Sequence, residues 1–76
     1  MKNDYLQAGE QKRLRIGVTQ RVYKLARNKQ ESTELFSALY RDIKSAFHVD
    51  SYKDIKRKDL QTALRYIDNW RPRKAS

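Results

Sequence analysis

The stretch that decides the fold class of this chain is TELFSALYRDIKSAF, residues 33–47. Its apolar side chains recur every three or four positions, which places them on one face of a helix over an arc of about 140°. They are Leu35, Phe36, Leu39, Tyr40, Ile43, Ala46 and Phe47. We expect Ser32 or Thr33 to cap this helix, and Glu34 suits the positive end of its dipole.

The segment that follows, residues 48–55, breaks this periodicity. Val49, Tyr52 and Ile55 recur every three residues, which indicates a tight turn or a short 3-10 helix that still packs inward. Ser51 or Asp54 is expected to cap the element that comes next.

A last helix is predicted over residues 57–70. Its inward face carries Leu60, Ala63, Leu64, Ile67 and Trp70, with Tyr66 at the edge. The spacing of Trp70 from Ile67 and Ala63 favours a place in the core. Pro72 disfavours helix at the residue before it and therefore ends the element.

A first helix is predicted over residues 11–30, because Leu14, Val18, Val22 and Leu25 fall on one face. Gly17 lies inside it and weakens it by about 1 kcal/mol relative to alanine. The chain is thus expected to be all-α: a small three-helix bundle over residues 11–70, with a short turn or 3-10 segment before the last helix. Residues 1–10 are expected to form a flexible N-terminal segment, and residues 71–76 a basic C-terminal tail.

The charge of the chain indicates the kind of partner it binds. It carries 18 Lys and Arg against 9 Asp and Glu, a formal net charge of +9 in 76 residues. Residues 1–30 and 51–76 hold most of the excess, whereas residues 31–50 are slightly acidic. Such segregation is typical of a chain that binds a polyanion rather than one that only needs solubility.

Composition argues against several classes of protein. With no cysteine and His48 as the one histidine, we expect neither a metal site nor a cofactor. There is no phosphate-cradling glycine loop and no nucleophile motif, so we do not expect an enzyme. No apolar run approaches the about 20 residues of a membrane span, and the first ten residues lack the apolar stretch of a signal peptide. We therefore expect a cytoplasmic protein without membrane attachment.

Residues 47–60, FHVDSYKDIKRKDL, with Ala63, Tyr66 and Ile67 after them, carry a family resemblance. They resemble the C-terminal domain of phage antirepressor-type proteins, the module named after the sixth open reading frame of a phage. The Val-x-Ser-Tyr-x-x-Ile turn is the more specific part, and the likeness covers about residues 35–70. The resemblance implies a phage or prophage origin, a place in the host cytoplasm, and a link to transcription regulation or DNA transactions.

The outward face of the first helix is a candidate binding surface. Ile16 and Tyr23 project away from the core stripe, among Lys12, Thr19, Gln20 and Arg27. One interpretation is a nucleic-acid surface, where cations meet phosphates and the ring stacks. The other is a second packing face, in a homo-oligomer or against another helix. The candidate nucleic-acid-binding residues here are Lys12, Arg15, Tyr23, Lys24 and Arg27.

The turn into the last helix is a second basic region. It carries Lys53, Lys56, Arg57 and Lys58, where a helix N-terminus would itself favour anions. We weigh a phosphate clamp against a solvated turn and favour the clamp slightly. Arg73, in the tail, is either part of a basic arm that follows DNA or part of an unordered end.

These features predict a non-catalytic phage regulatory module that binds nucleic acid, DNA rather than RNA. The alternative is a protein-interaction or oligomerisation module of a phage regulator. A helix-turn-helix with the last helix as reader is less favoured, because the outward face of that helix is only mildly basic.

Overall fold

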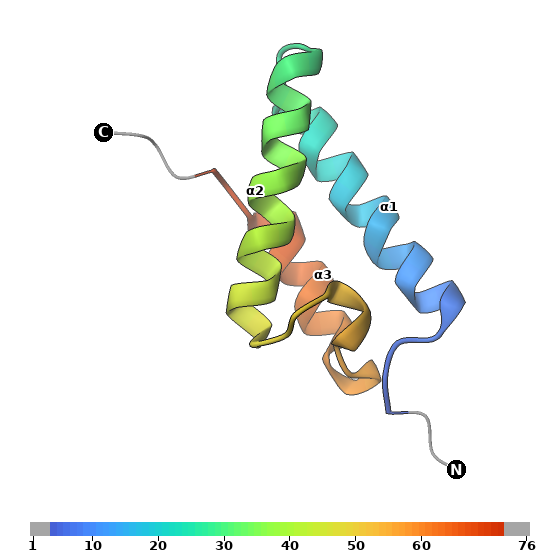
Figure 1. The fold of residues 1–76 in the computed structure, drawn as a ribbon. Helices are drawn as coiled ribbons and strands as arrows, with labels where there is room; N and C mark the ends of the chain where they lie inside the picture. Colours follow the sequence, from blue (N-terminus) through green and yellow to red (C-terminus); the bar gives the residue numbers. More distant parts are fainter. Residues whose placement is uncertain (1–3, 73–76) are drawn as a thin grey trace.

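A computed structural model of the chain describes residues 4–72, and within them the fold is an all-α bundle of three helices. Helix α1 spans Ala8–Leu25, α2 spans Lys29–Phe47 and α3 spans Leu60–Asn69. Two short 3-10 helices, η1 (Tyr52–Asp54) and η2 (Arg57–Asp59), precede α3. In Figure 1, α1 and α2 lie side by side and diverge from their shared loop, and α3 packs where they separate. The predicted fold class, including the 3-10 segment before the last helix, is confirmed.

The junction between the first two helices lies earlier in the chain than the sequence predicts. Helix α1 ends at Leu25 rather than residue 30, and α2 begins at Lys29 because Asn28 caps it. The Asn28 side chain accepts a hydrogen bond from the Glu31 backbone N–H at 2.8 Å. The prediction that Ser32 or Thr33 caps this helix is wrong: both hydroxyls donate to the Lys29 carbonyl inside the helix.

Residues 4–10 belong to the fold, which differs from the flexible segment expected there. Helix α1 already begins at Ala8, and Leu6 is buried in the core. The Leu6 N–H donates to the Ile55 carbonyl at 3.1 Å, and the Arg57 N–H donates to the Asp4 carbonyl at 2.8 Å. This short segment therefore holds the end of the chain against the turn before α3.

The turn between α2 and α3 is built by successive caps. His48 adopts the left-handed conformation and ends α2, while the Val49 N–H donates back to the Lys44 carbonyl at 3.0 Å. Ser51 caps η1, accepting from the Lys53 N–H at 3.3 Å. The prediction that Ser51 or Asp54 caps the element after residue 55 is wrong, because Lys56 precedes η2 and Asp59 precedes α3, and neither makes a side-chain cap bond. Helix α3 begins at Leu60, after η2, rather than at residue 57.

The core lies between the three helices and confirms most of the predicted faces. Leu14, Val18 and Val22 of α1 meet Leu35, Leu39 and Ile43 of α2 and the inward residues of α3, with Leu6, Ile55 and Trp70 closing the ends. Ala46 was expected on the core face but is exposed. It lies in the last turn of α2, where Figure 1 shows that α1 has diverged. None of the helices in residues 4–72 combines the length and the apolarity that crossing a bilayer requires.

Gly17 gives the first testable consequence of this packing. It lies inside α1 facing α3, and an added Cβ would meet Leu64 Cδ2 at 3.6 Å and Ile67 Cγ2 at 4.0 Å, ordinary contact distances. Gly17→Ala should raise the free energy of unfolding by about 1 kcal/mol, because alanine favours helix and adds contact. Urea denaturation followed by circular dichroism measures it.

Gly9→Ala is the matched control, since a Cβ there would have no neighbour within 4 Å. It should gain from helix propensity alone, and by no more than the Gly17 variant. A Gly17→Ala protein less stable than the parent would contradict the packing described here.

Candidate nucleic-acid interface

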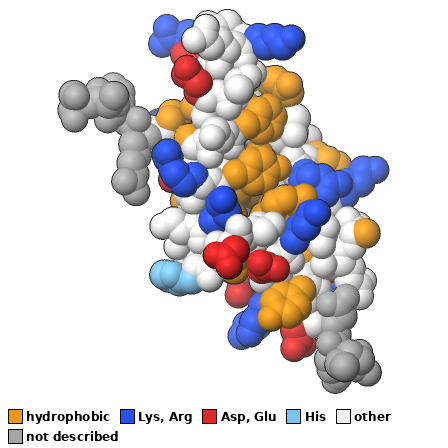
Figure 2. All heavy atoms as spheres, in the orientation of Figure 1, with side chains coloured by type: hydrophobic (Ala, Val, Ile, Leu, Met, Phe, Trp, Pro, Cys, Tyr) orange, Lys and Arg blue, Asp and Glu red, His pale blue; other side chains and the backbone are white. Residues whose placement is uncertain are grey.

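Four aromatic side chains form a row along the junction of α1 and α2, and we call this row the aromatic seam. Tyr23 comes from α1, Phe36 and Tyr40 from α2, and Tyr52 from η1. The Tyr23 and Phe36 rings meet edge to face with centroids 5.9 Å apart, and the Tyr40 and Tyr52 rings lie 5.5 Å apart at 42°. Tyr23 is 63% exposed and the other three are half-buried. Figure 2 shows a column of apolar side chains along this junction, open to solvent.

Local sequence explains why these rings reach the surface. Phe36 and Tyr40 are one turn apart on α2, at the edge of its apolar arc next to Ser37 and Lys44. The apolar residues that α2 buries are Leu35, Leu39 and Ile43. The two rings therefore pack their inner sides on the core and leave their outer sides uncovered.

Cations surround the aromatic seam. The Arg15 guanidinium donates to the Tyr52 hydroxyl at 2.9 Å, and Lys44 lines a shallow hollow with Tyr40 and Tyr52. We group six residues as the seam cations. Arg15, Arg27, Lys29 and Lys44 bond to a ring of the seam or share a hollow with one, Lys53 follows Tyr52 in the sequence, and Lys12 lines a groove with Arg15. Figure 2 shows Lys and Arg side chains on both sides of the apolar column.

The seam cations are available to an anionic ligand. Within residues 4–72 the ion pairs join Arg41 to Asp42 at 3.6 Å and Arg57 to Glu10 at 3.1 Å, and neither pair includes a seam cation. Burial, followed by the neighbouring Tyr52, raises the pKa of the Tyr40 hydroxyl above its ordinary value. Tyr40 is thus a neutral hydroxyl at physiological pH and does not repel phosphate.

Of the residues predicted on the first helix, the structure brings most to this surface. Lys12 and Arg15 line a groove with Ile16, Thr19 and Gln20, and Arg27 lines a hollow beside Tyr23. Lys24 lies elsewhere. It shares a helix face with Gly17 and Arg21, and both of these contact α3 or the residue after it.

The basic residues of the predicted phosphate clamp are not all free to bind phosphate. Arg57 Nε pairs with Glu10 Oε2 at 3.1 Å, and the backbone of Lys56 forms an isolated antiparallel β-bridge with the backbone of Tyr5. A hydrogen bond from the Gln7 N–H, and then the Arg57 side chain, lower the pKa of Glu10 and keep it anionic. Lys58 is exposed. However, Arg57–Asp59 form η2, so the position directly before α3 is occupied by the acidic Asp59 rather than by one of these cations.

Lys53 and Arg73 are the other two predicted nucleic-acid-binding residues. Lys53 follows Tyr52 in η1 and is exposed at the end of the aromatic seam. Arg73 lies outside the described residues.

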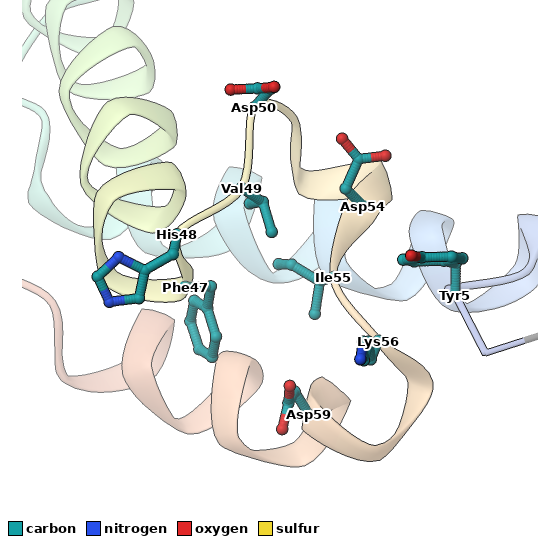
Figure 3. A pocket seen from close by; sticks show the side chains of 9 residues that line it. All are labelled: Tyr5, Phe47, His48, Val49, Asp50, Asp54, Ile55, Lys56 and Asp59. Atoms are coloured by element: carbon teal, nitrogen blue, oxygen red, sulfur yellow. The ribbon is translucent and has the colours of Figure 1, made fainter.

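A hollow of about 430 Å³ lies below the seam, between the end of α2 and the N-terminal segment. In Figure 3 the side chains of Phe47, Val49 and Ile55 form its floor, while Asp50 and Asp54 point away from it. Asp59 lies at the far side, so the three carboxylates do not converge. No group of three or more His, Cys, Asp or Glu in the described part of the chain is arranged to hold a metal ion. The three carboxylates around this hollow disfavour phosphate here and favour the seam above it.

Phe36, Tyr40 and Tyr52 are the candidate residues that sequence reasoning missed, because their spacing places them with the core. The arc of about 140° on α2 was the available signal, since one neighbouring helix covers less than that.

Comparison with known proteins identifies one family. A family model described as the ORF6C domain matches residues 1–76. No curated protein and no solved structure matches the chain.

Proposed function

Because this chain belongs to the ORF6C domain family, we propose that it is a non-catalytic phage or prophage regulatory module that binds nucleic acid, mainly DNA. The family match agrees with the resemblance carried by the turn around Tyr52. That resemblance links the module to gene regulation in the cytoplasm of a phage host.

The aromatic seam and its cations are the observation that carries this proposal. Lys and Arg that lack carboxylate partners neutralise phosphates and release counterions, which supplies most of the affinity for nucleic acid. Arg15 is held beside Tyr52 by its hydrogen bond and presents the rest of its guanidinium outward. Arg27 and Lys29 extend the positive surface past Tyr23.

Binding of fluorescently labelled DNA, measured by anisotropy at low salt, tests the proposal. Arg15→Gln combined with Arg27→Gln should weaken binding by about tenfold or more, since two phosphate contacts are lost. Lys24→Gln combined with Arg65→Gln removes two exposed cations away from the seam; it is the charge-matched control and should bind like the parent. Absence of binding at low salt, or equal loss in the control, would contradict the proposal.

A second candidate function is docking to another protein chain through α1. Ile16 is 46% exposed and lies two turns before Tyr23 on the same outward face. Light scattering of the parent and of Ile16→Asp distinguishes the two functions. A stable oligomer that this change dissolves, in a protein that does not bind DNA, would favour docking.

A further inference from the structure

We propose that the aromatic seam holds unpaired bases, so that the ligand of this surface is a single-stranded segment of nucleic acid rather than a duplex. This inference rests on the proposed nucleic-acid binding and names its substrate class. It follows from the packing of the rings against the core, from their spacing, and from the charge around them.

The rings are fixed platforms with an open side. Phe36, Tyr40 and Tyr52 pack against the buried core, so their positions are set before any ligand arrives. Each ring keeps part of its surface exposed, and Figure 2 shows apolar side chains open to solvent along the junction of α1 and α2. A ring held this way loses little conformational freedom when a base stacks on it, which favours binding.

The spacing of the rings fits separated bases. Phe36 and Tyr40 are four residues apart on α2, a rise of about 6 Å. Bases in a duplex are stacked about 3.4 Å apart and show only their edges in the grooves. Half-buried rings cannot reach between them. An unpaired strand can instead offer one base to each ring.

The charge around the rings also favours a single strand. A single strand presents flat apolar faces and an anionic backbone together, and the seam offers aromatic rings beside Arg15, Lys44 and Arg27. Asp50 lines the hollow beside Tyr40 and Tyr52 and would repel phosphate. The strand therefore lies along the seam between Tyr23 and Tyr52, where the cations outnumber this carboxylate.

An abasic strand separates stacking from phosphate binding. We would compare labelled oligo(dT), oligo(U), an abasic strand of the same length and a duplex by anisotropy at one salt concentration. Base stacking contributes about 1–3 kcal/mol per base, so removing the bases should weaken binding about 10-fold or more. This loss, relative to oligo(dT) or oligo(U), supports the inference. Equal affinity for the abasic and base-bearing strands overturns it and leaves phosphate binding intact. No binding to any probe overturns both proposals.

Variants at Tyr23 test whether the bases stack on the aromatic seam. Because Tyr23 is 63% exposed, replacing it should disturb the fold little. Tyr23→Leu should weaken binding of the base-bearing strand about fivefold or more and leave the abasic strand unchanged, whereas Tyr23→Phe keeps the ring and the affinity. An equal loss for both strands in Tyr23→Leu would overturn the inference.

Discussion

Trp70→Ala should remove a large part of the free energy of unfolding of the chain. Trp70 follows the last turn of α3, is 5% exposed, and closes one end of the core. Truncating a buried Trp to Ala costs about 3–5 kcal/mol. A chain of this length has a total stability of about 4–11 kcal/mol, so the variant would lose at least about a quarter of it.

The loss of one side-chain hydrogen bond adds to this cost, and a second bond, to the backbone carbonyl, remains in the variant. The indole Nε1 of Trp70 donates to Asp42 Oδ2 at 2.9 Å, and the Trp70 carbonyl accepts from Arg21 Nε at 2.8 Å. Trp70 therefore ties α3 to both α1 and α2. Without the indole, the half-buried Asp42 carboxylate loses its donor.

Urea denaturation followed by circular dichroism measures the effect, since Trp fluorescence is lost with the residue. Trp70→Phe keeps most of the volume and should fall between the parent and Trp70→Ala. Arg71→Ala, at the exposed next position, should match the parent. A Trp70→Ala protein destabilised by less than about 1 kcal/mol would show that this end of the core is not closed by the indole.

Periodicity was sufficient to predict the helices and the place of Trp70, but it did not settle where α1 gives way to α2. Asn28, Ser32 and Thr33 are all good caps by chemistry. The choice among them depends on α1 ending at Leu25, and the packing of three helices decides that. The bonds of Leu6 to Ile55 and of Arg57 to Asp4 join residues about fifty apart, so no local pattern predicts them.

The candidate site was also predictable only in part, because some of its residues depend on the packing of the helices. Lys12, Arg15, Tyr23 and Arg27 stand out because their helix face is polar and Tyr23 interrupts it. Phe36 and Tyr40 instead follow the apolar period of α2, and their exposure depends on how far α1 covers that helix. The pairing of Arg57 with Glu10 likewise requires two segments that only the fold brings together.

The affinity of the chain for single-stranded nucleic acid should fall by about 10²-fold between 50 and 200 mM salt. If all six seam cations contact phosphates, the logarithm of the binding constant falls with the logarithm of salt at a slope of about −4, which is about −0.7 per phosphate for a single strand. Lys44→Gln, an exposed change that removes one cation beside Tyr40, should reduce the slope by about 0.7, whereas Arg65→Gln should not change it. Anisotropy titrations at four or five salt concentrations measure the slope. A slope flatter than about −1 would mean that phosphates contribute little, and the exposed Ile16 and Tyr23 would then fit an apolar partner better than a polyanion.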